Sequence, residues 1–404
     1  MIMVDGLINF NQNEISPTII KVIGVGGGGG NAVEYMHKQG ICDVDFVLCN
    51  TDYQILEHSQ VPIKIQLGRA LTEGRGAGNR PEVGEAAANE SFKEIEELLR
   101  NSTKMVFITA AMGGGTGTGA APVIAKVAKE MGILTVGIVT IPSRFEGPKR
   151  LEQAREGVRR LKGYVDSLII IDNEKIQRIY GSQTLSTAFA KANDVLNTAV
   201  KGIAEIITLP GYINVDFADV RTVMTDSGIA IMGAAKASGE DRAKRVIVDA
   251  LNSPLLNKSD ILGASNILLN ITSGTDEITM DEMSEITSYI IKEVGDNAAV
   301  IWGVGTDESL GDSISVTIIA TGFSTTDVEN TFTAPIKGGI PVTMSETEED
   351  PERIKKIKDG VKDYVQVILK ESDVILQPDL PQEKIKELET TPAYTRRQIK
   401  IDRI

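Results

Sequence analysis

Short apolar runs, each followed by a turn and an amphipathic stretch, fill the first half of the chain. Runs at 19–25, 45–50, 105–111, 134–141 and 167–172 are mainly apolar, which is the pattern of strands buried on both faces. Helix-length segments separate successive runs, so the order predicts βαβ units and a parallel sheet. Ligands of such sheets bind at the carboxyl ends of the strands, where this chain repeatedly places Asn, Asp, Glu or Gly.

A long amphipathic segment divides the chain in two. Apolar residues recur at three- and four-residue spacing over 185–209, which predicts one long helix with a buried stripe. From about 220 to 323, apolar strands alternate with helices at 240–252 and 280–293, without another glycine cluster of the phosphate-binding type. We therefore predict an α/β protein with a Rossmann-like parallel-sheet domain, a long central helix, and a second, smaller α/β domain with a mixed sheet.

The two ends of the chain lack this pattern. Residues 1–17 are rich in Asn and Gln, so we expect a flexible N-terminal arm. Beyond 323 the sequence becomes mixed in charge, and apolar residues over 354–368 have the spacing of one amphipathic helix. The segment 391–401 is short, basic and partly apolar; it predicts either a solvated, flexible C-terminal tail or a linear docking motif.

Composition narrows the class of protein. The 404-residue chain carries 42 Lys and Arg against 56 Asp and Glu, a formal charge of −14, and has no basic block, which argues against nucleic acid as the main partner. Its two cysteines, Cys42 and Cys49, exclude a disulfide framework and favour a reducing compartment. No signal-peptide pattern is visible, and no apolar run approaches the ~20 residues of a membrane span, so we expect a soluble, cytoplasmic protein without direct membrane insertion.

The densest chemical signal is a glycine-rich segment after the third of these runs. Five of the seven residues from Gly113 to Gly119 are glycine, and the other two are threonine. Glycine turns sharply and has no Cβ to keep a bulky anion away, and the following helix, with Pro122 expected in its first turn, supplies free N–H groups and a partial positive charge. The segment predicts a phosphate-binding turn; a strand-to-helix turn without a ligand is the alternative.

A second glycine cluster, Gly-Val-Gly-Gly-Gly-Gly at 24–29, follows the first predicted strand. By itself it fits the G-x-G-x-x-G pattern of a dinucleotide fold, and Asp52 stands roughly where such a fold has its ribose-binding acid, so an NAD-linked oxidoreductase is one hypothesis. Two phosphate-binding turns favour instead one nucleoside triphosphate held between loops. A third glycine-rich loop lies at 74–81, and no G-x-x-x-x-G-K-[ST] sequence of a P-loop NTPase occurs.

The chemistry available near these loops is that of carboxylates and arginines. His37 and His58 have no repeated ligand spacing, so neither a zinc site nor a Ser-His-Asp triad is supported. Phosphoryl transfer to water requires charge neutralisation, which Mg²⁺ and Arg150 would supply, and a carboxylate that polarises the attacking water. The candidate acids are Asp52, Glu146, Asp172, Asp216 and Asp219.

Two of these acids lie too far along the chain to reach a nucleotide in the same subunit. Asp216 and Asp219 follow the long helix, whose start is expected near the nucleotide, and a helix of that length spans ~30 Å at ~1.5 Å per residue. If these acids are catalytic, they must act on a nucleotide bound by a neighbouring subunit.

Three ordered motifs together resemble a known family. Gly-Gly-Gly-Thr-Gly-Thr-Gly at 113–119 is similar to the tubulin-superfamily signature, and with the cluster at 24–29 and Asn-Val-Asp-Phe-Ala-Asp-Val-Arg at 214–221 the chain resembles the FtsZ family of bacterial cell-division GTPases over about 18–323. The resemblance implies GTP/GDP binding, Mg²⁺ held mainly through phosphates and water, and head-to-tail filaments that form the cytokinetic ring in the cytoplasm at the division site. A tubulin-like filament with another role, such as plasmid positioning or cell shape, is the alternative.

The resemblance assigns roles residue by residue. Asn214, Asp216 and Asp219 would form the catalytic loop that inserts into the next subunit. The implied nucleotide-binding residues are Gly26, Gly27, Gly28 and Asn31 in the first phosphate loop; Gly76, Ala77 and Gly78 near the γ-phosphate; Gly113, Gly114, Gly115, Thr116, Gly117, Thr118 and Gly119 around the phosphates; Glu146 at the ribose; Arg150 at the phosphate end; and Asn173, Phe189 and Asp194 at the guanine. No dedicated protein metal site is implied.

The resemblance also implies an organisation of the whole chain. The implied parts are a flexible arm at 1–17, a GTP-binding domain at 18–184, a central helix at 185–209, a catalytic loop at 210–219, a C-terminal α/β domain at 220–323, and a linker with a docking tail at 324–404. The tail would bind membrane-tether and regulatory division proteins. At one position the tail departs from the family pattern, since Thr395 stands where relatives tend to have a larger apolar residue.

Overall fold

The computed structural model describes residues 18–323, except 42, 101, 209–211, 214, 254–260, 262 and 296–297. All of these described residues belong to one compact unit of the chain. The predicted arm at 1–17, the tail at 324–404 with its predicted helix at 354–368, and the candidate catalytic residue Asn214 lie outside the described residues.

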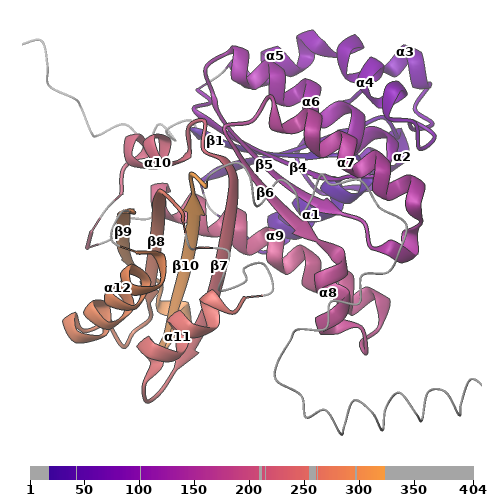
Figure 1. Cartoon of the computed structure of the whole chain (residues 1–404). Helices are drawn as coiled ribbons and strands as arrows, with labels where there is room; N and C mark the ends of the chain where they lie inside the picture. The colour runs from indigo at the N-terminus through magenta and orange to yellow at the C-terminus, as the bar shows by residue number, and fades with distance from the viewer. Residues whose placement is uncertain are drawn as a thin grey trace, which may run out of the picture. The chain divides into compact units, whose positions relative to one another are not determined.

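One sheet of ten strands runs through the described part of the chain (Figure 1). Its strands, in sheet order, are β3 (Ile63–Gln66), β2 (Val44–Asn50), β1 (Ile20–Val25), β4 (Met105–Ala111), β5 (Leu134–Ile141), β6 (Ser167–Asp172), β7 (Gly228–Ser238), β10 (Ser313–Thr321), β8 (Asn266–Ser273) and β9 (Ala299–Thr306). Neighbours from β3 to β7 are parallel, β10 is antiparallel to β7 and β8, and β8 and β9 are parallel. The predicted α/β fold, with a parallel and a mixed part, is confirmed.

Two layers of helices cover the parallel part of the sheet. One contains α1 (Gly26–Lys38), α2 (Tyr53–His58), α8 (Asn173–Tyr180) and α9 (Leu185–Thr208), and the other contains α4 (Pro81–Glu90), α5 (Phe92–Arg100), α6 (Gly115–Glu130) and α7 (Pro148–Lys162). In β1, Ile20 and Val22 pack on the first layer, whereas Ile23 and Val25 pack on the second. Because both faces are covered, the whole of β1 is buried, as its continuous apolar run predicts.

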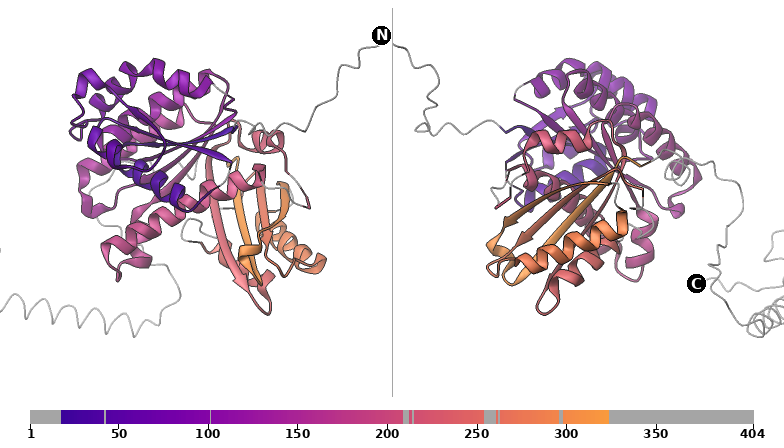
Figure 2. Two further views of the ribbon diagram at one scale, coloured as in Figure 1. Left: turned by 180° about the vertical axis from the view of Figure 1, so that it is seen from behind. Right: turned by 60° about the vertical axis from the view of Figure 1, so that its left-hand side comes forward.

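The central helix α9 is buried against both halves of the molecule. The predicted apolar stripe is confirmed, since Leu196, Ala199 and Ile203 are buried in a cluster that also contains residues of α1 and of the parallel strands. On the other side α9 contacts the mixed sheet, where a Cβ placed on Gly202 would lie 2.7 Å from the Thr317 Cγ2 of β10. Figures 1 and 2 show α9 between the parallel strands and the strands β7 to β10.

The C-terminal half packs helices on both faces of its mixed sheet. Helices α11 (Arg242–Leu251) and α12 (Met280–Val294) cover one face, and α9 and α10 (Phe217–Met224) cover the other. The strand β7 joins the halves, because its first residues pair with β6 and its later residues pair with β10. In neither half does the described chain contain a helix that is long and apolar enough to cross a membrane.

The structure corrects where the helices after the two glycine clusters begin. We expected turns before the helices, but α1 starts at Gly26 and α6 at Gly115, so Pro122 lies inside α6 and not in its first turn. Close packing explains glycines within a helix: a Cβ placed on Gly28 would lie 2.3 Å from the Ala111 Cβ, and one on Gly119 would lie 1.9 Å from the Pro81 carbonyl oxygen. Many of these glycines therefore allow helices to approach backbone at very short range.

A second correction concerns the polar segment that follows α9. We expected a loop through Asp219, but α10 begins at Phe217. Asp216 is its N-cap: Asp219 N donates to Asp216 Oδ1 at 2.9 Å, and Asp216 N donates to Asp219 Oδ2 at 3.3 Å. This reciprocal capping box satisfies N–H groups that the first helical turn leaves free, which is why the helix starts inside a polar stretch. The short edge strand β3 was also not predicted.

The packing of α6 on α4 yields a stability prediction. Gly119→Ala should lower the free energy of unfolding by roughly 2 kcal/mol or more, because the methyl group overlaps the Pro81 carbonyl and the gain in helix propensity, ~1 kcal/mol, does not offset this. Urea unfolding without added nucleotide measures the change. Gly114→Ala is the matched control, since a Cβ there meets nothing within 4 Å; equal stability of the two variants would contradict the packing role of Gly119.

Candidate functional site

Two helix N-termini meet at the carboxyl ends of β1 and β4. Neither the N-cap residue of α1, Val25, nor that of α6, Gly114, makes a side-chain capping hydrogen bond. The two ends are adjacent, because a Cβ placed on Gly26 would lie 2.8 Å from Gly117 N. Uncapped N–H groups and the positive ends of two helix dipoles therefore converge, which is an arrangement that binds anions.

The glycines of this region serve different purposes. Gly26 and Gly113 have φ of +72° and +99°, a conformation that side chains rarely adopt. Gly27 and Gly114 differ, since a Cβ on either would meet nothing within 4 Å. No neighbouring protein atom explains why these two positions carry glycine, and the open space beside them fits a ligand that approaches the backbone. The residues present therefore fit a phosphate group.

The two threonines of the cluster are engaged inside the protein. Thr116 and Thr118 are both buried. Thr118 Oγ1 accepts a hydrogen bond from Gly113 N at 2.8 Å, which holds the turn before α6. The Thr116 hydroxyl lies 2.7 Å from the hydroxyl of Thr51, just beyond β2. Both hydroxyls thus fix the backbone around the anion-binding N–H groups.

The loop at 74–80 closes on this region from the side. Gly76 N donates to Thr51 O at 3.3 Å, and the Ala77 Cβ would lie 2.9 Å from a Cβ placed on Gly115. Gly76, Gly78 and Asn79 all have positive φ, so the loop depends on left-handed conformations. The structure therefore brings the predicted segment 76–78 next to the start of α6.

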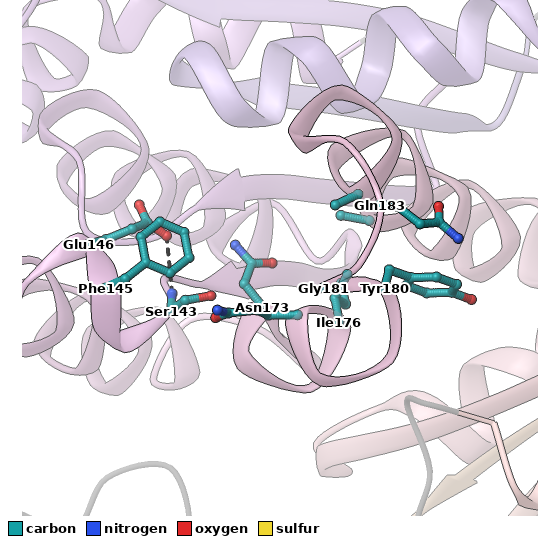
Figure 3. Close-up of a pocket in the computed structure, with 11 residues that line it drawn as sticks. Ser143, Phe145, Glu146, Asn173, Ile176, Tyr180, Gly181 and Gln183 are labelled. Carbon is teal, nitrogen blue, oxygen red and sulfur yellow. Dashed lines mark hydrogen bonds between the residues drawn. The ribbon is translucent and has the colours of Figure 1, made fainter.

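A cavity of about 240 Å³ lies beside the N-terminal part of α9 (Figure 3). Asn173, the first residue of α8, lines it, and its Oδ1 is buried without a hydrogen-bond partner within the described residues. The cavity therefore presents an unused acceptor to a ligand with N–H donors. Its walls are Ser143, Phe145, Glu146, Asn173, Ile176, Gln177, Tyr180, Gly181, Gln183, Ala188 and Ala192.

Glu146 and Arg150 connect the cavity to the helix N-termini. Glu146 ends the turn η1 (Arg144–Glu146), where its Oε1 accepts from Ser143 N at 3.1 Å and its Oε2 pairs with Arg150 Nη1 at 2.9 Å. The Arg150 backbone borders the glycine turn, because its carbonyl oxygen would lie 2.9 Å from a Cβ on Gly113. We call the paired N-termini of α1 and α6, with the glycine turns before them, the phosphate-type site. The predicted side chains of Glu146 and Arg150 thus lie between the cavity and this site.

The guanine-binding residues expected on α9 are only partly described. Asp194 accepts hydrogen bonds from Tyr35 Oη and, at 3.1 Å, from Lys191 Nζ. The hydrogen bond to Asp194 raises the pKa of Tyr35, so the phenol stays protonated. Tyr35 lies on α1 one turn after the exposed Asn31, and sequence reasoning missed it although i,i+4 spacing places both on one face. The side chain of Phe189 lies outside the described part of α9.

Of the remaining candidate acids, Asp52 and Asp172 border the site but cap short helices, whereas Asp216 and Asp219 lie elsewhere. Asp52 caps α2 by accepting from Gln54 N at 3.0 Å, and Asp172 caps α8 by accepting from Glu174 N at 2.8 Å. Burial raises the pKa of Asp172. Asp216 and Asp219 are exposed on α10, which in Figure 1 lies on the opposite side of the molecule from α2 and α3 (Arg69–Thr72). The structure therefore separates these two acids from the glycine turns, as the length of α9 predicts.

The described residues lack a cluster of side chains that could bind a metal ion. Among the residues that the structure describes, no group of three or more His, Cys, Asp and Glu side chains is arranged so that it could hold a metal ion. A metal ion at the glycine turns would therefore depend on oxygen atoms brought by a ligand and on water.

Comparison with known proteins places the chain in a family. Residues 19–181 match the model of the Tubulin/FtsZ family, GTPase domain, and residues 228–324 match that of the FtsZ family, C-terminal domain. The cell division protein FtsZ of Porphyromonas gingivalis is 45% identical over 423 aligned residues, covering 100% of this chain and 91% of that protein. The one from Pseudomonas putida is 53% identical over 305 residues, covering 75% and 76%.

Solved structures agree with these sequence matches. The structure titled "FtsZ dimer, empty", of M. jannaschii, has a TM-score of 0.71 and 43% identity, covering 76% of this chain and 88% of that one. CetZ2 from Haloferax volcanii, at 20% identity and a TM-score of 0.65, shares the fold. With both domain models matched in order and relatives of this identity, the chain belongs to the Tubulin/FtsZ family.

Proposed function

We propose that this chain is a GTPase of bacterial cell division that assembles head to tail and hydrolyses GTP at the contact between subunits. The observation that carries the proposal is the separation of two half-sites. The uncapped helix N-termini and the cavity lie near the start of α9, whereas Asp216 and Asp219 lie beyond its end. Neither half is complete alone, and head-to-tail stacking of identical subunits brings them together.

We place GTP in the first half-site with its phosphates at the helix N-termini and its base toward the cavity. Its phosphates lie at the N-termini of α1 and α6, where Gly27 and Gly114 leave room and the loop at 76–78 closes over the γ-phosphate. The ribose lies at Glu146, beside Arg150, and the base enters the region of Asn173, Phe189 and Asp194. A carboxylate suits guanine because one edge of that base offers two adjacent N–H donors.

Mg²⁺, when bound, supplies neutralisation of the phosphate charge. The described residues offer no cluster of ligands for it, so we assign its coordination to phosphate oxygens and water. Arg150, held by Glu146, adds a fixed positive charge at the phosphate end.

The second half-site presents two carboxylates on a rigid support. In the capping box, one oxygen of Asp216 and one of Asp219 accept backbone hydrogen bonds, which fixes both side chains at the start of α10. The remaining oxygens are available to polarise a water molecule that attacks the γ-phosphate of the neighbouring subunit's GTP. We assign Asn214 to the same segment.

Exposed apolar side chains at both half-sites support burial between subunits. Tyr212, four residues before Asp216, and Met280, three residues after the Tyr212 partner Glu277, are 69% and 76% exposed, and Tyr53 and Leu71, near the loop at 74–78, are 50% and 51% exposed. Such side chains are favourable at an interface and unfavourable in water. We extend the proposal to a cytoplasmic location at the division site, with the tail at 324–404 binding membrane-tether and regulatory proteins of division.

A shared active site predicts that catalysis depends on assembly. GTP turnover per subunit should rise steeply with protein concentration and level off once filaments form, because only assembled subunits have both half-sites. Phosphate release and sedimentation, measured on the same samples with GDP as the control, test this. A turnover per subunit that is independent of concentration would contradict the shared site.

Replacing Asp219 should separate binding from hydrolysis. Asp219→Asn should bind GTP normally and still sediment with it, but hydrolyse it about 10²-fold more slowly, because the amide retains an acceptor for the capping box and lacks the charge that polarises water. Asp226→Asn, at an exposed acid beyond α10, is the control with the same loss of charge. Normal turnover by Asp219→Asn would remove this residue from the mechanism.

Gly114→Ala should weaken nucleotide binding without weakening the fold. A Cβ at this position meets no protein atom within 4 Å, so unfolding in urea should be unchanged, while the methyl group occupies the space assigned to phosphate and should raise the Kd for GTP roughly tenfold or more. Titration with a fluorescent GTP analogue measures the affinity. Unchanged affinity would show that phosphate does not approach Gly114.

A further inference from the structure

An exposed arginine projects from the loop beside the phosphate-type site. Arg75 lies between Gly74 and Gly76, which have φ of +74° and +82°, and its backbone forms a bridge with Asp52. Its side chain is 85% exposed, and its ion pair with Glu73, itself 72% exposed, is loose at 3.7 Å. Such a pair contributes little free energy in water. The first half-site therefore presents a largely uncompensated cation on an anchored backbone.

An exposed glutamate lies beside the second half-site. Tyr212 Oη donates to Glu277 Oε1 at 2.9 Å, and Tyr212 lies just before the segment that carries Asp216. This hydrogen bond raises the pKa of Tyr212, so the phenol remains a donor at neutral pH. Glu277 is thereby oriented at the edge of the surface that contains the catalytic acids of the proposed mechanism.

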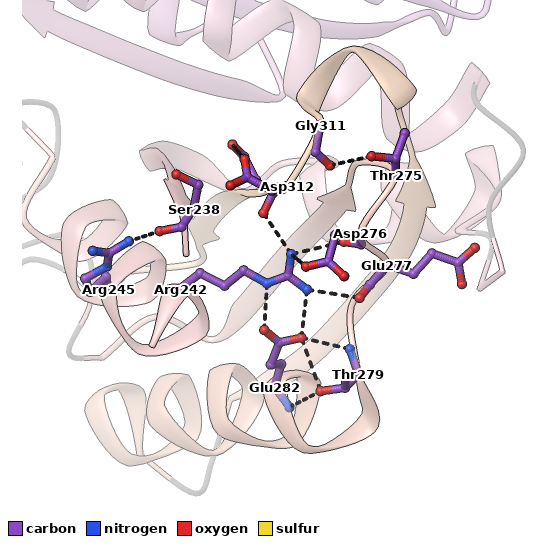
Figure 4. Close-up of polar contacts among 11 residues, drawn as sticks. Ser238, Arg242, Arg245, Thr275, Asp276, Glu277, Thr279, Glu282, Gly311 and Asp312 are labelled. Atoms are coloured by element: carbon purple, nitrogen blue, oxygen red, sulfur yellow. Dashed lines mark hydrogen bonds and ion pairs between the residues drawn. The ribbon is translucent and has the colours of Figure 1, made fainter. Parts of the chain in front are cut away.

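A buried arginine fixes the backbone under Glu277. Arg242 is 5% exposed, pairs with Glu282 through Nε at 2.7 Å and Nη2 at 3.1 Å, and donates from Nη2 to Glu277 O at 3.0 Å. Its Nη1 donates to Asp276 and to Asp312 O. Figure 4 shows the Glu277 carboxylate pointing away from Arg242. The hydrogen bond from Arg242 therefore fixes the Glu277 backbone, while the Glu277 carboxylate remains exposed to solvent and can pair with a cation of another subunit.

The two surfaces have opposite charge. Between the starts of α3 and α4 the exposed charged residues are Arg69, Arg75 and Arg80 against Glu73, whereas in the segments 212–221 and 276–281 they are Asp216, Asp219, Asp276, Glu277 and Asp281 against Arg221. With a formal charge of −14, copies of this chain repel one another on average. A contact between the arginine-bearing and the acid-bearing surface reverses this repulsion locally and favours one relative orientation.

Resting on the head-to-tail assembly proposed above, we propose that Arg75 of one subunit forms an ion pair with Glu277 of the next. Asp216 and Asp219 are less suited to this pairing, because their carboxylates hold the cap of α10 and face the reacting water. Glu277 lies at the margin of the same surface, as Arg75 lies at the margin of the phosphate-type site. Partial removal of water on assembly makes this pair stronger than an ion pair on a free surface.

Charge exchange tests the pairing in the full chain. Arg75→Glu and Glu277→Arg should each raise the concentration needed for GTP-dependent sedimentation roughly tenfold or more, because each places like charges together. The double variant should return to within about threefold of the unchanged protein, since it restores the pair with reversed polarity. Lys93→Glu and Glu97→Arg, exposed positions on α5 with the same changes in charge, should leave assembly unaltered.

The outcomes separate this pairing from the proposed function. If the unchanged protein fails to sediment with GTP, the head-to-tail assembly itself is wrong. If it sediments but the double variant is no better than the worse single variant, the pairing is overturned. The neutral variant Arg75→Gln/Glu277→Gln gives a second test: its assembly threshold should depend less on NaCl concentration than that of the unchanged protein, and an equal salt dependence would also overturn the pairing.

Discussion

The close approach of α1 and α6 is the contact on which the rest of the site depends. It exists because glycine occupies positions where a Cβ would overlap neighbouring atoms, as at Gly26 against Gly117 of α6, and Gly28 likewise lets α1 approach Ala111 at the end of β4. The result is a pair of uncapped helix N-termini side by side, which neither helix could provide alone. The same packing holds the loop at 74–80 through Gly115, so the region that would contact a γ-phosphate is attached to the phosphate-type site.

The central helix α9 keeps the two proposed half-sites apart within one subunit, so that assembly is needed to bring them together. Because α9 is buried against both the parallel strands and the mixed sheet, it holds the cavity near its start and the acids beyond its end at a fixed separation. A single subunit cannot close that distance by moving a side chain. The proposed hydrolysis between subunits therefore depends on the rigid placement of α9. Because α9 holds two incomplete half-sites apart, only the stacking of identical subunits completes the active site.

The acid-bearing surface has its own internal support. Arg242 is buried, which is costly for a charge unless its donors are satisfied, and here the carboxylate of Glu282 and several backbone carbonyl oxygens accept from it. These bonds join α11 to the start of α12 and to the segment that contains Glu277. The backbone around Asp276 and Glu277 is thus held in place, so the Glu277 side chain projects from a fixed position.

The α/β fold, the central helix with its buried stripe and the family resemblance can all be predicted from the amino-acid sequence, because apolar periodicity and long ordered motifs are local properties of the chain. The sequence also placed Asp216 and Asp219 far from the nucleotide, since helix length follows from residue count. Which glycines pack and which leave room for a ligand depends on contacts between distant segments: Gly119 and Gly114 look alike in the sequence, but a Cβ meets the Pro81 carbonyl at the first and open space at the second. The tertiary structure likewise decided the partnership of Tyr35 with Asp194 and of Arg242 with Glu277, because these contacts join residues that are remote in sequence and leave no periodic signal.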